Sequence, residues 1–186
     1  NFGGGVVIKN FTLVCDTSTQ TSIIEENYSG DGGALFLECT ESTLQNIKIQ
    51  NNAYNAGGYQ HGTEVLLYEK ANVSIDSGDV IIKNEGTNDR GVYVRNSSNA
   101  LKLSGAAKLD TPIYLEKGAM VTVAGEMSEE GTVATITPAE YEVRTQVLTA
   151  ENYVTLDVAK FALTPAADGT SYTIDSDGKL VAESST

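Results

Sequence analysis

The chain has 186 residues, 40% of them hydrophobic, and carries a formal net charge of −13. This length fits one domain or two small ones, and the hydrophobic content is enough for a buried core. The acidity argues against a nucleic-acid partner, because phosphate binding needs clustered Lys and Arg, whereas only 12 such residues are spread along this chain. Membrane insertion is also not expected, because no segment approaches the roughly 18 consecutive apolar residues of a membrane span.

The first residues already belong to a β pattern. The chain opens with "NFGGGVVIKNFTL", and no secretory signal precedes this segment. We therefore expect a fragment of a longer protein whose targeting segment is missing.

Two kinds of short alternating strand recur along the first two thirds of the chain. The first kind is expected at residues 6–8, 35–37, 66–68, 92–94 and 113–115. The second kind reads apolar–polar–apolar and is expected at residues 11–13, 47–49, 73–75, 101–103 and 121–123. Successive strands of the second kind lie between 20 and 36 residues apart.

This spacing predicts a stacked repeat fold, because periods of about 20–50 residues mark such architectures. The repeated unit contains strands rather than helical periodicity, which excludes helical solenoids, and the fixed asparagine and leucine spacing of leucine-rich repeats is absent. A parallel β-helix fits, since each coil pairs with the next about 4.8 Å away and turns of unequal length loop out of the stack. A β-sandwich also uses alternating strands, but it does not explain the recurring unit.

Cys15 and Cys39 are the only two cysteines, too few for a disulfide framework. They pair if neighbouring strands bring them together; otherwise they are two small buried side chains. The sequence leaves both possibilities open.

The repeated unit ends near residue 125, and shorter strands follow. Turns are expected at residues 129–131, 167–169 and 175–178. Residues 137–140, "TPAE", have a helix-start signature and predict one helical turn. We predict β-helix coils over residues 1–127 and a β-rich C-terminal cap or terminal coils over residues 128–186. A cap would cover unpaired backbone groups of the last coil and prevent end-to-end association.

Residues 32–58, "GGALFLECTESTLQNIKIQNNAYNAGG", resemble the coils of bacterial surface and secreted proteins with a pectate-lyase-like right-handed β-helix. Residues 112–141, together with the short strands that follow them, resemble the terminal part of such helices in repeat-rich bacterial surface proteins. The resemblance implies an all-β fold, namely a right-handed parallel β-helix in which a single chain winds into the solenoid (a single-stranded solenoid). It also implies an extracellular or cell-surface location. It leaves function open, since this fold carries lyases, hydrolases, adhesins and autotransported passengers.

Calcium-dependent lyases of this fold hold the ion with clustered carboxylates beside an Arg or Lys base. The candidate residues here are Asp76, Asp79, Asp89, Arg90, Glu25 and Glu26. None of them recurs at the same position of successive coils, which favours solvated turn residues.

Hydrolases of this fold show an adjacent Asp pair, a Gly-His-Gly and an Arg-x-Lys around paired carboxylates. The chain offers only Gln60-His61-Gly62. A lone histidine is more often a surface or hydrogen-bonded residue than a catalyst. We therefore predict no catalytic residue, no metal site and no cofactor.

A column of side chains on the outer side of the first kind of strand is the strongest candidate for a binding site. Alternation places Phe36, Leu67, Tyr93 and Tyr114 at equivalent outward positions, one per coil. Aromatic rings stack on sugar faces and are enriched at interfaces, so we predict that Phe36, Tyr93 and Tyr114 bind a ligand. The alternative is a structural role, in which the column stabilises the sheet or lies under a loop.

The sequence therefore predicts a non-enzymatic, adhesin-like surface or secreted module that presents an elongated face to a glycan or host protein. One alternative is a polysaccharide lyase or glycoside hydrolase of the β-helix fold, and another is a structural spacer. We expect either a monomer or end-to-end self-association.

Overall fold

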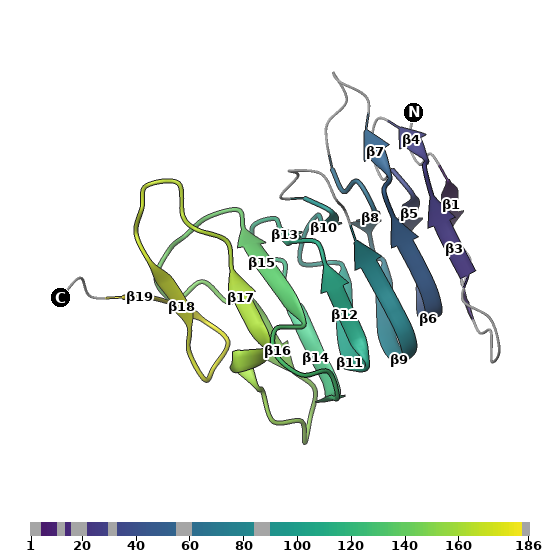
Figure 1. Ribbon diagram of the computed structural model, residues 1–186. Helices are drawn as coiled ribbons and strands as arrows, with labels where there is room; N and C mark the ends of the chain where they lie inside the picture. Colours follow the sequence, from purple (N-terminus) through teal and green to yellow (C-terminus); the bar gives the residue numbers. More distant parts are fainter. Residues whose placement is uncertain are drawn as a thin grey trace.

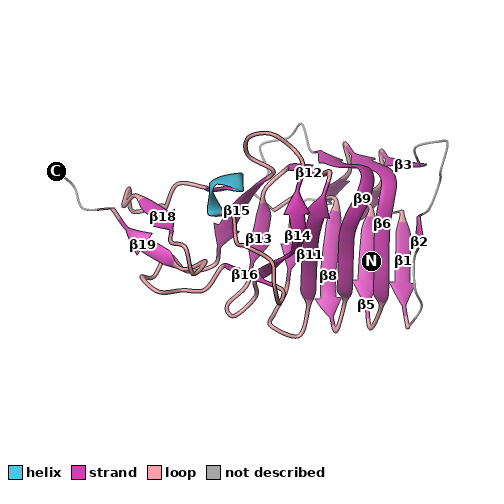
Figure 2. Cartoon of the chain, turned by 90° about the horizontal axis from the view of Figure 1, so that it is seen from below, coloured by secondary structure: helices cyan, strands magenta, loops and turns pink. Residues whose placement is uncertain are grey.

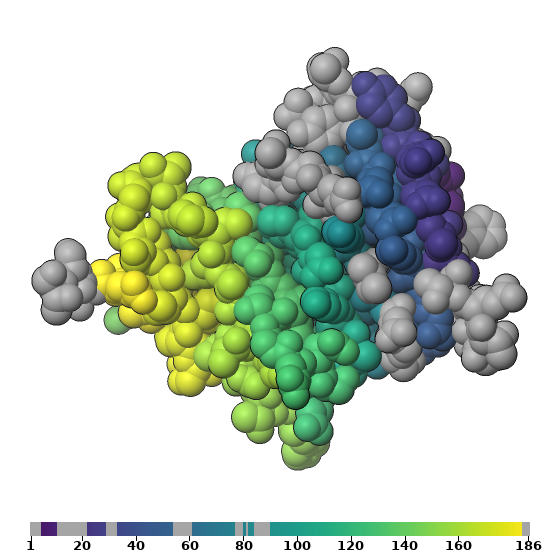
Figure 3. All heavy atoms as spheres, in the orientation of Figure 1, coloured from purple at the N-terminus to yellow at the C-terminus, as the bar shows by residue number. Residues whose placement is uncertain are grey.

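A computed structural model describes residues 5–10, 14–15, 22–29, 33–54, 61–83 and 90–183. It shows an all-β chain whose parallel sheets form a β-solenoid of about five turns, so the predicted β-helix is confirmed. The coils follow one another from the N-terminus to the C-terminus (Figures 1 and 2). In the space-filling view, successive stretches of sequence form neighbouring bands across the molecule (Figure 3).

The first sheet stacks strands in chain order along the solenoid, and every pair of neighbours is parallel. Its order is β1 (Val6–Lys9), β5 (Leu35–Glu38), β8 (Val65–Glu69), β10 (Val92–Val94), β13 (Ile113–Leu115), β15 (Ala134–Pro138) and β17 (Phe161–Leu163).

The second sheet is built around two long strands, β6 (Glu41–Gln50) and β9 (Asn72–Lys83). The other strands are β2 (Val14–Cys15), β3 (Ser22–Glu25), β11 (Ala100–Gly105), β12 (Ala107–Asp110), β14 (Val121–Met127) and β16 (Leu148–Ala150). The first halves of β6 and β9 continue the path to β11, β14 and β16, whereas their second halves pair with β3 and β12. Two further strands, β4 (Tyr28–Ser29) and β7 (Ala53–Tyr54), form a separate parallel pair.

The register confirms part of the predicted second strand series and corrects the rest. Leu101–Leu103 pair with residues 73–75 and 121–123, as expected. The alignment of residues 47–49 with residues 73–75 is wrong, because Ile47 pairs with Val80, and Leu44 takes the place opposite Ile75. The cause is an irregular pairing of β6 with β9, whose register shifts twice around Gln45, so residues 47–49 pair with residues 80–82 instead. Residues 11–13 lie outside the described residues.

The core runs along the axis of the stack and consists of inward-facing Leu, Ile and Val from both sheets. One row comprises Leu37, Leu67, Val94 and Leu115, which are paired from coil to coil and at most 2% exposed. Each coil therefore buries its apolar side chains against those of the next coil, which is why the strand pattern must repeat.

Residues at the corners of the coils let the chain turn sharply as it leaves the first sheet for the second. Asn10, Cys39 and Lys70 follow successive strands of the first sheet, and all three have positive φ angles of 59°, 51° and 48°. At a later corner the side chain of an asparagine satisfies backbone groups of the turn. Asn99 is buried, and its Oδ1 accepts a 3.0 Å hydrogen bond from the Ala71 N–H while its Nδ2 donates to the Tyr68 carbonyl at 3.2 Å.

The C-terminal third continues the parallel stack and ends in a hairpin. β15, β16 and β17 pair with the preceding coils, and the antiparallel strands β18 (Tyr172–Ile174) and β19 (Leu180–Ala182) follow. The hairpin docks on the second sheet through the Gly178 carbonyl, which accepts hydrogen bonds of 3.0 Å from the N–H groups of Val147 and Leu148. The division at residue 127 remains a prediction.

Two local predictions in this region have different outcomes. The turn at residues 175–178 is confirmed, since Asp175 Oδ1 accepts hydrogen bonds from the Asp177 and Lys179 N–H groups, both at 2.9 Å. The helical turn at residues 137–140 is wrong, because Thr137 and Pro138 lie in β15 and pair with β13. Pairing with the preceding coil outweighs the local helix-start signature. The helical segment in this third is a 3-10 turn at η1 (Val158–Lys160).

Candidate binding face

The outer side of the first sheet carries the predicted column, with one correction. The register places Phe36, Leu66, Tyr93 and Tyr114 at equivalent positions of β5, β8, β10 and β13. Leu67 was predicted in this column and instead lies in the core, fully buried. Pairing of β8 begins at Val65 rather than Leu66, and a shift of one residue moves a side chain to the opposite face of the sheet.

Most of the column is buried although it faces away from the core. Phe36 is 1% exposed and Tyr93 3%, whereas Tyr114 is half-buried. The Tyr93 and Tyr114 rings stack with centroids 4.8 Å apart and an interplanar angle of 24°. In this conformation Phe36 and Tyr93 do not present a free ring surface, so a ligand reaches the column most directly at Tyr114. The binding role of the three residues stays a prediction.

Basic and imidazole side chains lie against the rings and account for part of this cover. The contacts are Lys9 Nζ at 5.1 Å from the Phe36 centroid, Arg95 at 4.0 Å from Tyr68, Arg90 at 4.5 Å from Tyr114, and the His61 ring at 4.6 Å from Tyr93. A cation over an aromatic face stabilises an exposed site by about 0.5–1 kcal/mol. His61 therefore packs on the ring of Tyr93.

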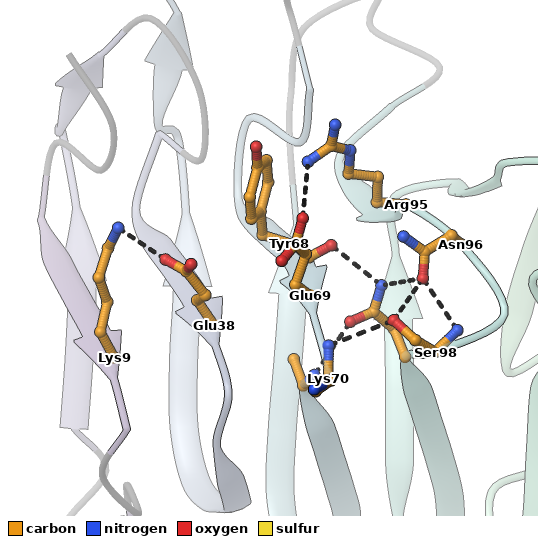
Figure 4. A network of polar contacts seen from close by, with 10 residues as sticks. Lys9, Glu38, Tyr68, Glu69, Lys70, Arg95, Asn96 and Ser98 are labelled. Carbon is orange, nitrogen blue, oxygen red and sulfur yellow. Dashed lines mark hydrogen bonds and ion pairs between the residues drawn. The ribbon is translucent and has the colours of Figure 1, made fainter.

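Acidic residues balance these cations along the corner that follows the first sheet. Lys9 pairs with Glu38 at 2.6 Å, and Arg95 lies 3.9 Å from Glu69 (Figure 4). On the column itself, the Tyr93 hydroxyl donates a 2.6 Å hydrogen bond to Glu116 Oε1. The face is thus a mixed-charge surface over a packed aromatic layer.

A hydrogen-bond network orders the loop beside Arg95. Asn96 Oδ1 accepts from the Ser98 N–H at 2.8 Å and from the Ser98 hydroxyl at 2.6 Å, while the Lys70 N–H donates to Ser98 Oγ at 3.3 Å (Figure 4). These contacts tie the corner of one coil to that of the next, and so fix the position from which Arg95 extends over Tyr68.

Sequence reasoning missed a buried carboxyl group at Glu64. This residue is 0% exposed and precedes β8; its Oε1 accepts a 3.2 Å hydrogen bond from the Asn52 N–H and its Oε2 a 2.5 Å bond from Asn52 Nδ2. Burial raises the pKa of Glu64 to about 7, and the hydrogen bonds from Asn52 oppose that rise. The sequence did contain a signal for this residue. Ala34 and Gly91 occupy the equivalent position, directly before β5 and β10, so a large acidic residue at this position of the coil is unusual.

The carboxylates considered for calcium are dispersed. Asp76 is exposed and accepts a 2.9 Å hydrogen bond from Gln45 Nε2, and Glu25 is exposed and accepts from Gln50 Nε2 at 2.6 Å. The side chain of Asp79 and the whole of Asp89 lie outside the described residues. Within the described part of the chain, no three His, Cys, Asp or Glu side chains form a group that could hold a metal ion.

Cys39 is a free thiol, and the side chain of Cys15 lies outside the described residues. No helix in the described ranges is long and apolar enough to cross a membrane.

No protein-family model matches the chain, and neither a curated protein nor a solved structure shows significant similarity to it.

Proposed function

We propose that this chain is a non-enzymatic β-helix module of a bacterial surface or secreted protein, adhesin-like in role, which presents an elongated face to a glycan or host protein. The observation that supports this proposal best is the first sheet. Six of its seven parallel strands, from β1 to β15, hold one outward position in register from Val7 to Thr137. The resemblance of residues 32–58 to coils of exported bacterial proteins supports the location.

Rigidity is the physical advantage of such a face. Neighbouring strands lie about 4.8 Å apart, and the stacked rings of Tyr93 and Tyr114 fix side chains that would otherwise be mobile. A surface that is already ordered loses little conformational entropy on binding, so several weak contacts along it add up more effectively.

Charge narrows the class of ligand. A net charge of −13 repels polyanions at long range, which disfavours polyuronates such as pectate. Uncharged glycans and basic protein surfaces are the ligands that suit a net negative charge.

A structural spacer is the second candidate function. The burial of Phe36 and Tyr93 favours it, because a ring that is 1–3% exposed contributes to packing rather than to recognition. The two proposals differ in what they expect of Tyr114, which a recognition face needs and a spacer does not.

A glycan array with the purified chain, run with and without calcium, tests the proposal. We expect calcium-independent binding to at least one glycan, weakened in Tyr114→Ala and retained in Val7→Ala, an exposed position of the same column. Binding to no glycan and to no host surface protein would support the spacer instead. Release of unsaturated sugars from pectin in a parallel assay would overturn the proposal in favour of a lyase.

A further inference from the structure

A pocket lies beside the second half of β14, away from the aromatic column. β16 pairs with β14 only over Val121–Val123, and the chain then leaves the sheet at Glu151. The loop of residues 151–157 and the rest of β14 line a half-open pocket of about 530 Å³. Ligand sites in proteins commonly enclose about 300–1,000 Å³.

The loop is anchored at its start and at its end. The Glu151 N–H donates a 2.9 Å hydrogen bond to the Val123 carbonyl, and the Val154 N–H donates to the Glu151 carbonyl at 3.1 Å. At the other end, Asp157 Oδ1 accepts a 3.2 Å hydrogen bond from the Ala159 N–H and so caps the 3-10 turn. Hydrogen bonds therefore fix the loop at both of its ends.

Tyr153, at the tip of this loop, has features that folding does not explain. Its side chain is fully exposed, at 107% of the reference area, and its φ angle is +69°. A left-handed backbone conformation costs a non-glycine residue about 1–2 kcal/mol, and an exposed ring contributes no burial in return. Strain of this kind concentrates at functional sites.

The residues that line the pocket match a sugar ring. Val123, Met127 and Val154 supply an apolar floor, and Glu126 and Asp157 supply exposed carboxylates. An aromatic ring stacks on the C–H face of a pyranose, and carboxylate oxygens accept hydrogen bonds from hydroxyl groups.

Charge separates neutral sugars from acidic ones. Two carboxylates and one ammonium group, that of Lys160, line the pocket, and this ammonium donates to the Glu129 carbonyl. The local charge is therefore negative, as is that of the whole chain, and a uronate would be repelled.

We propose that this pocket binds a neutral hexopyranose unit of a glycan, with Tyr153 as the ring on which the sugar stacks. The inference rests on the proposed function, since it names a ligand class and a contact site for the same recognition role. It adds a glycan contact at the loop of residues 151–157 to the one expected at Tyr114.

The test uses immobilised neutral hexose oligosaccharides, with oligogalacturonates as the acidic counterpart. Glycine adopts a positive φ without strain, so Tyr153→Gly should melt at the same temperature as the wild type or higher. We expect that variant to bind neutral oligosaccharides at least tenfold more weakly, and Tyr153→Phe to bind them as the wild type does. Tyr28→Ala, which removes another exposed tyrosine ring, is the matched control and should leave binding unchanged.

The outcomes separate the inference from the proposed function. Wild-type binding that persists in Tyr153→Gly but is lost in Tyr114→Ala would overturn the inference and leave the proposed function standing. A preference for oligogalacturonates would overturn the neutral-sugar assignment. If the wild type binds no oligosaccharide, the inference fails, and the proposed function then depends on a host protein as its ligand.

Discussion

The carboxyl group of Glu64 and the side chain and backbone of Asn52 form a buried, hydrogen-bonded pair. Both Glu64 oxygens accept hydrogen bonds from Asn52, at 3.2 and 2.5 Å, and neither residue is more than 3% exposed. Asn52 Oδ1 in turn accepts two 2.9 Å hydrogen bonds from Asn27, one from its backbone and one from its side chain. An ionisable group is thus built into the packing between coils.

Glu64 should make stability depend on pH near neutrality. Its folded-state pKa of about 7 exceeds the ordinary 4.5, so the folded state holds the proton more tightly than the unfolded state does. The resulting stabilisation is complete below pH 4.5 and is lost as pH rises to about 7. A shift of this size corresponds to about 3 kcal/mol at most.

Glu64→Gln provides the control for this pH dependence, because glutamine resembles the protonated acid and does not titrate. Urea unfolding from pH 4.5 to pH 8 should show the wild type losing stability relative to the variant. Parallel curves for the two proteins would show that Glu64 does not titrate in this range.

Tyr93 should behave as a packing residue. Tyr93→Ala is expected to lower the free energy of unfolding by about 3–5 kcal/mol, as for other buried aromatic residues. Tyr93→Phe keeps the ring but loses the hydrogen bond to Glu116, which predicts a loss of about 1–2 kcal/mol. Urea denaturation measures both, and a cost below about 1 kcal/mol for Tyr93→Ala would be incompatible with the burial described above.

Cys39 offers a test of the corner geometry. Its φ angle of +51° suits glycine, so Cys39→Gly should be more stable than Cys39→Ala by about 1–2 kcal/mol. Both substitutions remove the thiol, which makes the comparison independent of its contacts. Equal melting temperatures would argue against a left-handed corner at this position.

Gly178 should be required for docking of the C-terminal hairpin. A Cβ atom at this position would lie 2.2 Å from the Leu148 carbonyl oxygen, and the φ angle is +82°. Gly178→Ala is therefore expected to destabilise the protein by about 2 kcal/mol or more. Gly169→Ala is the control, since Gly169 has a similar φ of +79° with no atom within 4 Å of an added Cβ. Thermal melts in which both variants lose the same stability would contradict the close approach.

The fold could be predicted from the sequence because strand alternation in a β-helix is a local signal that every coil repeats. Where the local pattern allowed two alignments, the prediction failed. The run "EVLLYE" can place Leu66 or Leu67 outward, and pairing of Val65 with Leu35 decides between them. Likewise, the apolar–polar–apolar stretch of β6 is residues 47–49, and only the register shift near Gln45 shows that Leu44 pairs with Ile75 in its place.

The candidate sites were harder to predict from the sequence, because the burial of a side chain depends on the neighbouring coils. Alternation correctly placed Phe36 and Tyr93 on the outer face, but their burial depends on side chains such as Lys9 and His61 that come from elsewhere in the chain. Tyr153 lies in a segment without periodicity, so its backbone angle and its exposure could not be predicted from the sequence.

The central claim is that the stacked coils form a recognition module for a glycan. Hydrogen–deuterium exchange of the wild-type chain, with and without the best glycan from the array, tests it most directly. The account predicts slower exchange confined to peptides that cover β14 and the loop of residues 151–157, or those around Tyr114. No change in exchange at saturating concentrations of any glycan would contradict glycan recognition.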